Sequence, residues 1–537
     1  MAENRNPRTA DFIIAGAGHN SLITAGYLAR AGYSVIALDA RPIPGGGAAT
    51  EEPLLPGYRI DSCSTGHTII QGNPLMVNDE LGLKADFQLA YVDPDPVAHV
   101  RFPDGEHFTQ YLDLDKTLEE VARFSKKDSE AFARMMVEWE EVKAIFGREQ
   151  FAPAGSGDVD RRLAELSSAN IWKRRRLLSA WEIIKHEFES RHVQSFMLWQ
   201  AYQTLVRPDA AGSGLLAYSI VCARQRRSWT IPIGGSGRLS DALVASLEAD
   251  GGVVLVNHKV ASLILADGRC VGVRTESGEE FYGTKGVVST IHVKHLIDMA
   301  PPEAWDDSWR YGVETYEIGT SGFAVYLATT RPPQFVVDGG VRTAVSAGLV
   351  GWPEDVLSSA RNFADGVWRE DVQWLLIATP TLVDPGRVPV EGHHTVKLLG
   401  PEGWKVPAGD DWKSMKARRQ RVLMDAIQRW APEFTDYVVL ASMVKGPFDI
   451  EATNPHMIRG AFHGGERTLA FQGDQRPAPG WANHLTPIKG LYQTGATTHP
   501  GGSITGAPGR NAAIVILREE GRDLADVVRS PAGVTGA

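Results

Sequence analysis

The sequence has few cysteines, no long apolar run and no excess of positive charge. Its three cysteines among 537 residues are widely spaced and match no metal-ligand pattern, which favours a reducing, cytoplasmic location. No run of about 18 apolar residues occurs, so we expect no membrane-spanning helix. The net charge of −10 gives no general attraction to nucleic acid, which we do not expect as a partner. The polar first ten residues do not resemble a signal peptide.

The length and composition of the chain are those of an ordinary globular protein. With 43% hydrophobic and 22% charged residues, the chain can bury a large core. At 537 residues it is too long for a single core, so we expect two or three domains.

A strand–turn–helix–strand unit is predicted near the start of the chain. An apolar run at residues 12–14 breaks at Gly16 and Gly18, a helix follows, and a second apolar run ends at Asp39. This spacing is typical of a dinucleotide-binding turn, in which the first glycine allows a tight turn and the second allows close approach of a pyrophosphate. Asp39 is placed to accept hydrogen bonds from ribose hydroxyls and to repel a 2′-phosphate, which disfavours NADP.

The segment after Asp39 favours FAD over NAD. Arg41 is followed by a glycine run that NAD-binding proteins lack and that resembles the R-x-x-x-G-G segment of flavoproteins with two dinucleotide-binding motifs. In those proteins the glycines and the arginine border the FAD pyrophosphate. The FAD contacts expected from this part of the chain are Gly16, Gly18, His19, Asn20, Asp39, Ala40, Arg41, Gly46, Gly47 and Ala48.

A second FAD-binding segment is predicted near the C-terminus. A strand ending in a Gly-Ala turn is followed by a glycine-rich loop and by a helix from about Pro508. The N-terminus of this helix would stabilise negative charge on a reduced flavin by about 0.3–1 kcal/mol, or up to about 2 kcal/mol when partly buried. A strand near Val260 is where the backbone could meet adenine. The contacts expected here are Val260, Gly495, Ala496, Ser503, Thr505 and Gly506.

The order of strands and helices predicts an α/β fold with a Rossmann-type two-dinucleotide-binding FAD domain, a mixed-sheet substrate domain and a helical cap. We expect three segments, residues 1–113, 226–297 and 476–537, to form the FAD domain. Residues 114–225 are expected to form the cap, and residues 298–475 the substrate domain.

Two histidines are candidates for proton transfer or substrate orientation. His67 follows a short predicted strand whose loop is expected to pass near the flavin ring, and His499 lies in the C-terminal glycine-rich loop. The alternative for His67, which we favour, is a histidine whose ring is satisfied by the surrounding loop.

The basic and aromatic segment 172–184 has two interpretations. It could form an interfacial helix that contacts anionic lipid, giving a peripheral membrane contact. The interpretation that we favour is a solvated helix whose apolar residues pack inward.

Several motifs together resemble a known family. GAGHNSL, RPIPGGGAATEE, PGYRID, IGGSGRLSDAL and TPIKGLYQTGATTHPGGSITGAPGRNAA are similar to the bacterial-type phytoene desaturases, a phytoene dehydrogenase-like group of FAD-dependent oxidoreductases. The nearest branch is typified by pyridine nucleotide-disulfide oxidoreductase domain-containing protein 2. The resemblance implies FAD and this fold. It is less specific for the reaction, because family members often have glycine where this chain has Ser21 and Ser503, and cysteine where it has Thr494.

The leading functional hypothesis is therefore an FAD-dependent dehydrogenase that moves a hydride between an apolar or amphipathic small molecule and flavin N5. It would desaturate or saturate a C–C bond, with dioxygen or a quinone as the unidentified electron acceptor. One alternative is an amine or alcohol oxidase that uses dioxygen. Another is a flavin-bound, non-catalytic scaffold or assembly factor. The sequence makes no prediction about the oligomeric state.

Overall fold

The predicted dinucleotide-binding unit forms the centre of a seven-stranded sheet. The computed structural model describes residues 8–528, in which this sheet has the order β10-β11-β12-β1-β2-β9, with β20 paired to β12. β1, β2, β9, β12 and β20 run parallel, whereas β10 and β11 form an antiparallel extension. The strands are β1 (Thr9–Ala15), β2 (Val35–Leu38), β9 (Val253–Leu255), β10 (Val260–Ala266), β11 (Arg269–Thr275), β12 (Glu280–Ser289) and β20 (Leu491–Gln493).

Helices from both ends of the chain pack together on this sheet. α1 (His19–Arg30) contacts α10 (Gly237–Ala249) and α16 (Ala507–Glu519). A side chain at Gly509 would collide with the backbone of α1, since its Cβ would lie 2.1 Å from the carbonyl oxygen of Asn20. The Thr24 hydroxyl donates to the carbonyl of Gly509 at 2.8 Å. The two distant segments predicted to bind FAD therefore form one layer.

A second seven-stranded sheet has the order β19-β13-β18-β17-β16-β6-β7. Its strands are β6 (Ala98–Arg101), β7 (His107–Gln110), β13 (Ser321–Thr329), β16 (Ser346–Val350), β17 (Trp374–Ala378), β18 (His394–Glu402) and β19 (Val439–Lys445). β6 and β7 were expected in the first FAD segment, residues 1–113, but β6 instead pairs in parallel with β16. The sequence of two short strands does not indicate that one of them pairs with a strand about 250 residues later. The boundary expected at residue 113 therefore does not coincide with the division between the two sheets.

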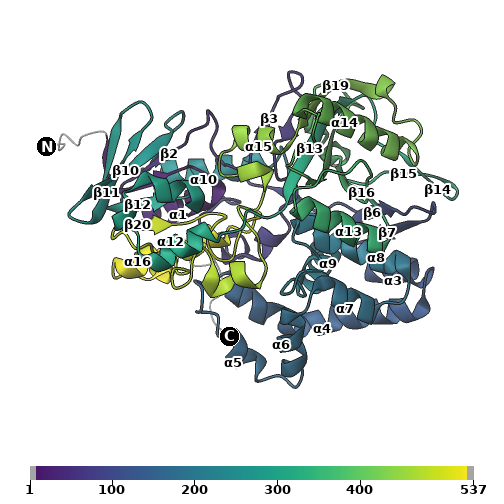
Figure 1. The fold of residues 1–537 in the computed structure, drawn as a ribbon, viewed down its shortest axis with the longest axis horizontal. Helices are drawn as coiled ribbons and strands as arrows, with labels where there is room; N and C mark the ends of the chain where they lie inside the picture. The colour runs from purple at the N-terminus through teal and green to yellow at the C-terminus, as the bar shows by residue number, and fades with distance from the viewer. Residues whose placement is uncertain (1–7, 529–537) are drawn as a thin grey trace.

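Helices of the cap cover the end of the second sheet that holds β6 and β7 (Figure 1). They are α3 (Leu114–Ala122), α4 (Lys126–Gln150), α5 (Val159–Leu163), α6 (Ala169–Leu177), α7 (Ala180–Glu187), α8 (Arg191–Ala201) and α9 (Leu216–Arg227). The remaining helices are α2 (Pro74–Val77), α11 (Val293–Leu296), α12 (Asp307–Glu314), α13 (Pro353–Ala364), α14 (Trp412–Gln428) and α15 (Pro447–Thr453). Short strand pairs are formed by β3 (Thr50–Glu51) with β4 (Ile60–Asp61), β5 (Tyr91–Val92) with β8 (Ile231–Pro232), and β14 (Phe335–Val337) with β15 (Gly340–Arg342).

Most aromatic and apolar side chains in the basic and aromatic segment of the cap pack inward, although Leu177 is 59% exposed. Trp172 is 1% exposed and its ring meets those of Trp139 and Tyr218. Arg175 is paired with Glu138 and Glu187. These contacts favour the inward-packed interpretation of residues 172–184. Among the helices of residues 8–528, none has both the length and the apolar character needed to cross a membrane.

Candidate functional site

A cavity of about 660 Å³ lies where the first sheet, the cap and the second sheet meet, within the usual size range of small-molecule sites. Most residues predicted to bind FAD line it. They are Gly16, Gly18, His19, Asn20, Asp39, Ala40, Arg41, Gly46, Gly47, Val260, Gly495, Ala496 and Ser503.

The turn between β1 and α1 is built for close approach of a ligand. Gly16 has φ +97°, and Gly18 has an ordinary extended conformation with open space where its Cβ would be. A Cβ on Gly46 would lie 3.3 Å from the Cα of Gly18, so the glycine run after Arg41 lies directly beside the turn. The backbone here is accessible without being strained at Gly18, as a pyrophosphate site requires.

Asp39 stabilises this turn in addition to lining the cavity. One carboxylate oxygen accepts from the backbone N–H of Ala17 and the other from that of Arg41, both at 2.9 Å. Burial raises the pKa of Asp39, and the two backbone hydrogen bonds oppose that rise. The carboxylate is thus held at the cavity wall, where a ribose is expected.

Buried polar atoms at the start of α1 also fit a bound dinucleotide. His19 and Asn20 are at most 9% exposed, and their Nε2 and Oδ1 atoms have no hydrogen-bond partner. A buried polar atom without a hydrogen bond lowers the stability of the protein, so a ligand that bonds to these two atoms would remove that cost. These features and the open space at Gly18 agree with FAD as the occupant.

Three residues predicted to contact FAD lie behind the cavity wall. The carbonyl of Ala48 accepts from the Ser240 hydroxyl at 2.7 Å. The carbonyl of Thr505 accepts from the Asn73 amide at 2.9 Å, and a Cβ on Gly506 would meet Asn73. Ala48, Thr505 and Gly506 are absent from the lining and support the loops that form it. Sequence spacing indicated the loops but not which side of them faces inward.

The two candidate catalytic histidines are also outside the lining. His67 is fully buried, and its ring contacts the Ser236 hydroxyl at 2.8 Å and the Tyr91 hydroxyl at 3.3 Å. The His499 ring contacts the carbonyl of Glu149 at 2.9 Å. These positions do not support the predicted roles, and for His67 they favour a ring satisfied within the protein.

Other histidines do face the cavity. His456 and His463 line it, and each has a buried ring nitrogen, Nε2 and Nδ1 respectively, without a hydrogen-bond partner. The other nitrogen of His456 is 3.0 Å from the carbonyl of Thr290. His463 lies in the stretch AFHGGERTLAFQGDQRP, which also resembles the phytoene desaturase family, but nothing in that stretch marks the histidine itself, and no motif includes His456.

A buried lysine on the second sheet was also missed. Lys397 lines the cavity from β18 and donates to the carbonyls of Cys63 at 2.5 Å and Asp61 at 3.4 Å. Burial lowers the pKa of Lys397, and the charge of Asp61 opposes that effect. Its charge therefore lies between the second sheet and the segment that follows β4.

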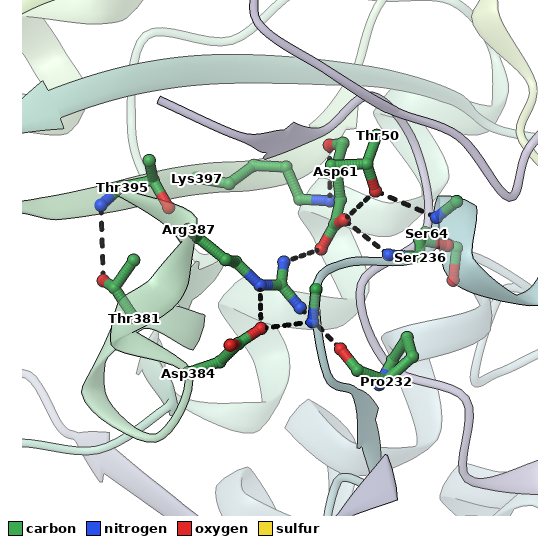
Figure 2. Close-up of polar contacts among 12 residues, drawn as sticks. Thr50, Asp61, Ser64, Pro232, Ser236, Thr381, Asp384, Arg387, Thr395 and Lys397 are labelled. Atoms are coloured by element: carbon green, nitrogen blue, oxygen red, sulfur yellow. Dashed lines mark hydrogen bonds and ion pairs between the residues drawn. The ribbon is translucent and has the colours of Figure 1, made fainter. Parts of the chain in front are cut away.

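An ionic network beside Lys397 joins the β3–β4 strand pair to the connection between β17 and β18 of the second sheet (Figure 2). The guanidinium of Arg387 donates to Asp61 and to Asp384, both at 2.7 Å, and all three side chains are almost fully buried. Asp61 also accepts from the backbone N–H of Ser236 at 2.7 Å and from the Thr50 hydroxyl at 2.8 Å. Through Asp61 the network therefore links Ser236, at the start of α10, to Arg387 beside the second sheet. Because α10 packs on α1, these contacts help to hold the second sheet against the FAD-binding part.

The cap, the second sheet and the loops that hold Trp229 and Phe462 contribute mainly apolar side chains to the cavity. We call this part the apolar region, and it is formed by Leu205, Ile220, Trp229, Trp374, Leu376, Leu399 and Phe462. Its lining excludes water and matches a hydrocarbon surface better than a charged one.

Buried neutral histidines predict a loss of stability in acid. Burial lowers the pKa values of His67, His463 and His484 to about 3 and those of His19 and His456 to about 4. Histidines in the unfolded chain take up protons near pH 6.5, so stability present above that pH is lost as the pH falls, by up to about 1.4 kcal/mol per group and pH unit. We expect the thermal unfolding midpoint to fall by at least about 5 °C between pH 7 and pH 5.

The His67→Gln variant offers a control for this pH dependence. Because one titrating group is removed, the midpoint should fall less steeply with acid, while the rate of flavin reduction stays unchanged. A midpoint that does not move between pH 7 and pH 5 would show that these histidines are solvated.

Comparisons with known proteins agree with this geometry. The family model of the flavin-containing amine oxidoreductases matches residues 22–517. A limonene dehydrogenase subunit from Castellaniella defragrans is 27% identical, with 96% of each chain covered. Pyridine nucleotide-disulfide oxidoreductase domain-containing protein 2 of Mus musculus is 26% identical over 95% of this chain and 93% of its own.

A phytoene desaturase and a solved oxidase extend the comparison. The neurosporene-forming phytoene desaturase of Cereibacter sphaeroides is 25% identical over 93% of this chain and 92% of its own. The structure of cyclohexylamine oxidase from Brevibacterium oxydans superposes with a TM-score of 0.57 at 15% identity, covering 96% of this chain and 100% of that one. These matches confirm the predicted resemblance, the fold class and FAD as the cofactor.

Proposed function

Because the chain belongs to the flavin-containing amine oxidoreductase family and is an FAD-dependent oxidoreductase, we propose that it desaturates or saturates a C–C bond of a largely apolar or amphipathic substrate. When bound, FAD supplies N5 as the atom that exchanges a hydride with the substrate. The electron acceptor would be dioxygen or a quinone.

The apolar region is the observation that carries this proposal. Side chains of the cap and the second sheet there would hold a hydrocarbon by shape and exclude water from the reacting carbon. The unpartnered ring nitrogens of His456 and His463 are the groups we propose for moving the accompanying proton, in place of His67 and His499. The names of the limonene and phytoene relatives support a hydrocarbon-like substrate.

Charge around the cavity argues against an amine substrate. Arg224 and Lys397 line it from the cap and the second sheet, where they would repel a substrate ammonium group. The described carboxylates in the lining are Asp39, Glu276 and Asp298. Asp39 and Glu276 belong to the segments expected to bind FAD, and Asp298 lies in a short helical turn that contacts β10 of the first sheet. A non-catalytic scaffold is also disfavoured, because the cavity continues from the residues expected to bind FAD into the apolar region, which leaves room for a substrate.

Anaerobic incubation of the purified yellow protein with candidate substrates tests this proposal. We expect that an apolar or amphipathic substrate whose C–C bond is desaturated will bleach the flavin absorbance at roughly 450 nm. In the opposite direction, the matching alkene should reoxidise chemically reduced flavin. Reoxidation rates with a quinone and with dioxygen then identify the acceptor. Bleaching by primary amines alone would overturn the proposal in favour of an amine oxidase.

A further inference from the structure

Arg224 is a buried cation without a counter-ion. It lies on α9, is 4% exposed and lines the cavity. Its guanidinium donates to the side-chain oxygens of Gln200 at 2.9 Å and Gln203 at 3.3 Å, and it lies 5.8 and 5.6 Å from the ring centroids of Trp199 and Trp229. Among residues 8–528, no carboxylate lies within ion-pair distance of it.

This arrangement differs from that of two other buried arginines. Arg387 is paired with Asp61 and Asp384, and Arg419 is paired with Glu402. A buried charge without a partner is costly, so its retention suggests that something else supplies the anion. Burial alone lowers the pKa of Arg224 to about 9, which still leaves it charged at neutral pH.

Two further donors near Arg224 also lack acceptors. The Nε2 of Gln203 and the Oγ1 of Thr204 are buried without a hydrogen-bond partner, and both residues line the cavity. Gln203 is held in place because its Oε1 accepts from Arg224. A guanidinium without a counter-ion therefore lies beside an amide N–H and a hydroxyl without acceptors, and an anionic oxygen group would satisfy all three.

We propose that Arg224, Gln203 and Thr204 form a subsite for the carboxylate of an amphipathic substrate. The apolar body of that substrate would extend along Leu205, Ile220 and Trp229, and this part of the inference rests on the proposed function. A carboxylate is favoured over a phosphomonoester because one cation balances one negative charge. The subsite would orient the substrate chain by anchoring its polar end.

Ligand binding without turnover tests the subsite. The flavin-loaded protein is titrated with decanoate, 1-decanol and decylamine, and binding is followed by flavin difference spectra and by calorimetry. We expect decanoate to bind at least about tenfold more tightly than decanol, and decylamine to bind most weakly. Equal affinities for decanoate and decanol in the unmodified protein would overturn the proposal, and so would binding of chloride or inorganic phosphate without any preference for decanoate.

Variants separate a ligand role from a structural one. Arg224→Met should abolish the preference for decanoate, Arg224→Lys should keep part of it, and Gln203→Leu should weaken it about three- to tenfold. Arg227→Met, which removes an exposed cation from the same helix, should leave it unchanged. Decanoate should raise the melting temperature of the parent but not that of Arg224→Met. A preference that persists in Arg224→Met would overturn the subsite.

These outcomes distinguish the subsite from the proposed reaction. If a neutral hydrocarbon bleaches the flavin while decanoate shows no preference, the reaction stands and the subsite fails. If decanoate binds through Arg224 but no unsaturated or saturated compound exchanges electrons with the flavin, the subsite stands and the proposed reaction fails. Loss of flavin from Arg224→Met would assign the residue to the cofactor and overturn the carboxylate role.

Discussion

The Gly18→Val variant is expected to fold but to be purified without colour. Gly18 has φ −71°, which any residue adopts, and its Cβ would meet no protein atom within 4 Å. The added side chain would instead occupy the space where the backbone must approach the pyrophosphate. We expect FAD to bind at least about a hundredfold more weakly, equivalent to about 2.7 kcal/mol.

The absorbance ratio at 450 and 280 nm and a titration of the apoprotein with FAD measure this loss. Gly147→Val is the matched control, because its Cβ also meets open space but the residue lies on α4 outside the cavity lining. Gly16→Ala separates folding from binding, since φ is +97° there and the Cβ would lie 2.4 Å from Thr290, so folding itself should suffer. A yellow Gly18→Val protein with full flavin content would show that this turn does not hold the cofactor.

The parts of the site that could be predicted from sequence are those whose signal is local. The turn containing Gly16 and Gly18 is flanked by an apolar strand and a helix within about 30 residues, and the structure has both. The helix after Pro508 is similarly marked by its proline and its preceding glycines. Each of these segments is recognisable because its backbone geometry demands particular residues over a short distance.

The parts that could not be predicted depend on partners far apart in the chain. The ring of His67 is satisfied by Ser236, 169 residues later, so nothing near His67 shows that it is turned away from the cavity. Arg224 lies in the run Arg224-Gln225-Arg226-Arg227, which resembles a solvated basic helix end. Only the folded position of α9 shows that Arg224 is buried at the cavity whereas Arg226 and Arg227 are exposed.

The Asp61→Asn variant is expected to be strongly destabilised, because Asp61 joins the first part of the chain to the second sheet. Its carboxylate accepts from Arg387, Ser236 and Thr50 in a fully buried position. An asparagine leaves Arg387 with Asp384 as its single anionic partner, and breaking a buried pair of this kind typically costs about 3–5 kcal/mol. Urea denaturation of the flavin-loaded protein, followed by far-UV circular dichroism and flavin release, measures the loss.

The same carboxylate predicts part of the acid sensitivity. Burial by itself would raise the pKa of Asp61, but the charges of Arg387 and Lys397 outweigh it and hold the pKa below its ordinary value. Stability from Asp61 is therefore present above the pKa of an unfolded aspartate and is lost as the pH falls through the lower, folded value. The difference in stability between the parent and Asp61→Asn should shrink in this acidic range.

A surface pair provides the control for the buried one. Asp307 pairs with Arg310 on α12 but is 94% exposed, so Asp307→Asn should change stability by less than about 1 kcal/mol. Arg387→Met should cost at least as much as Asp61→Asn, because it leaves the buried carboxylates of Asp61 and Asp384 without the cation that pairs with both. If Asp61→Asn and Asp307→Asn cost the same, the ionic network does not hold the β3–β4 pair and α10 against the second sheet, and apolar packing alone must do so.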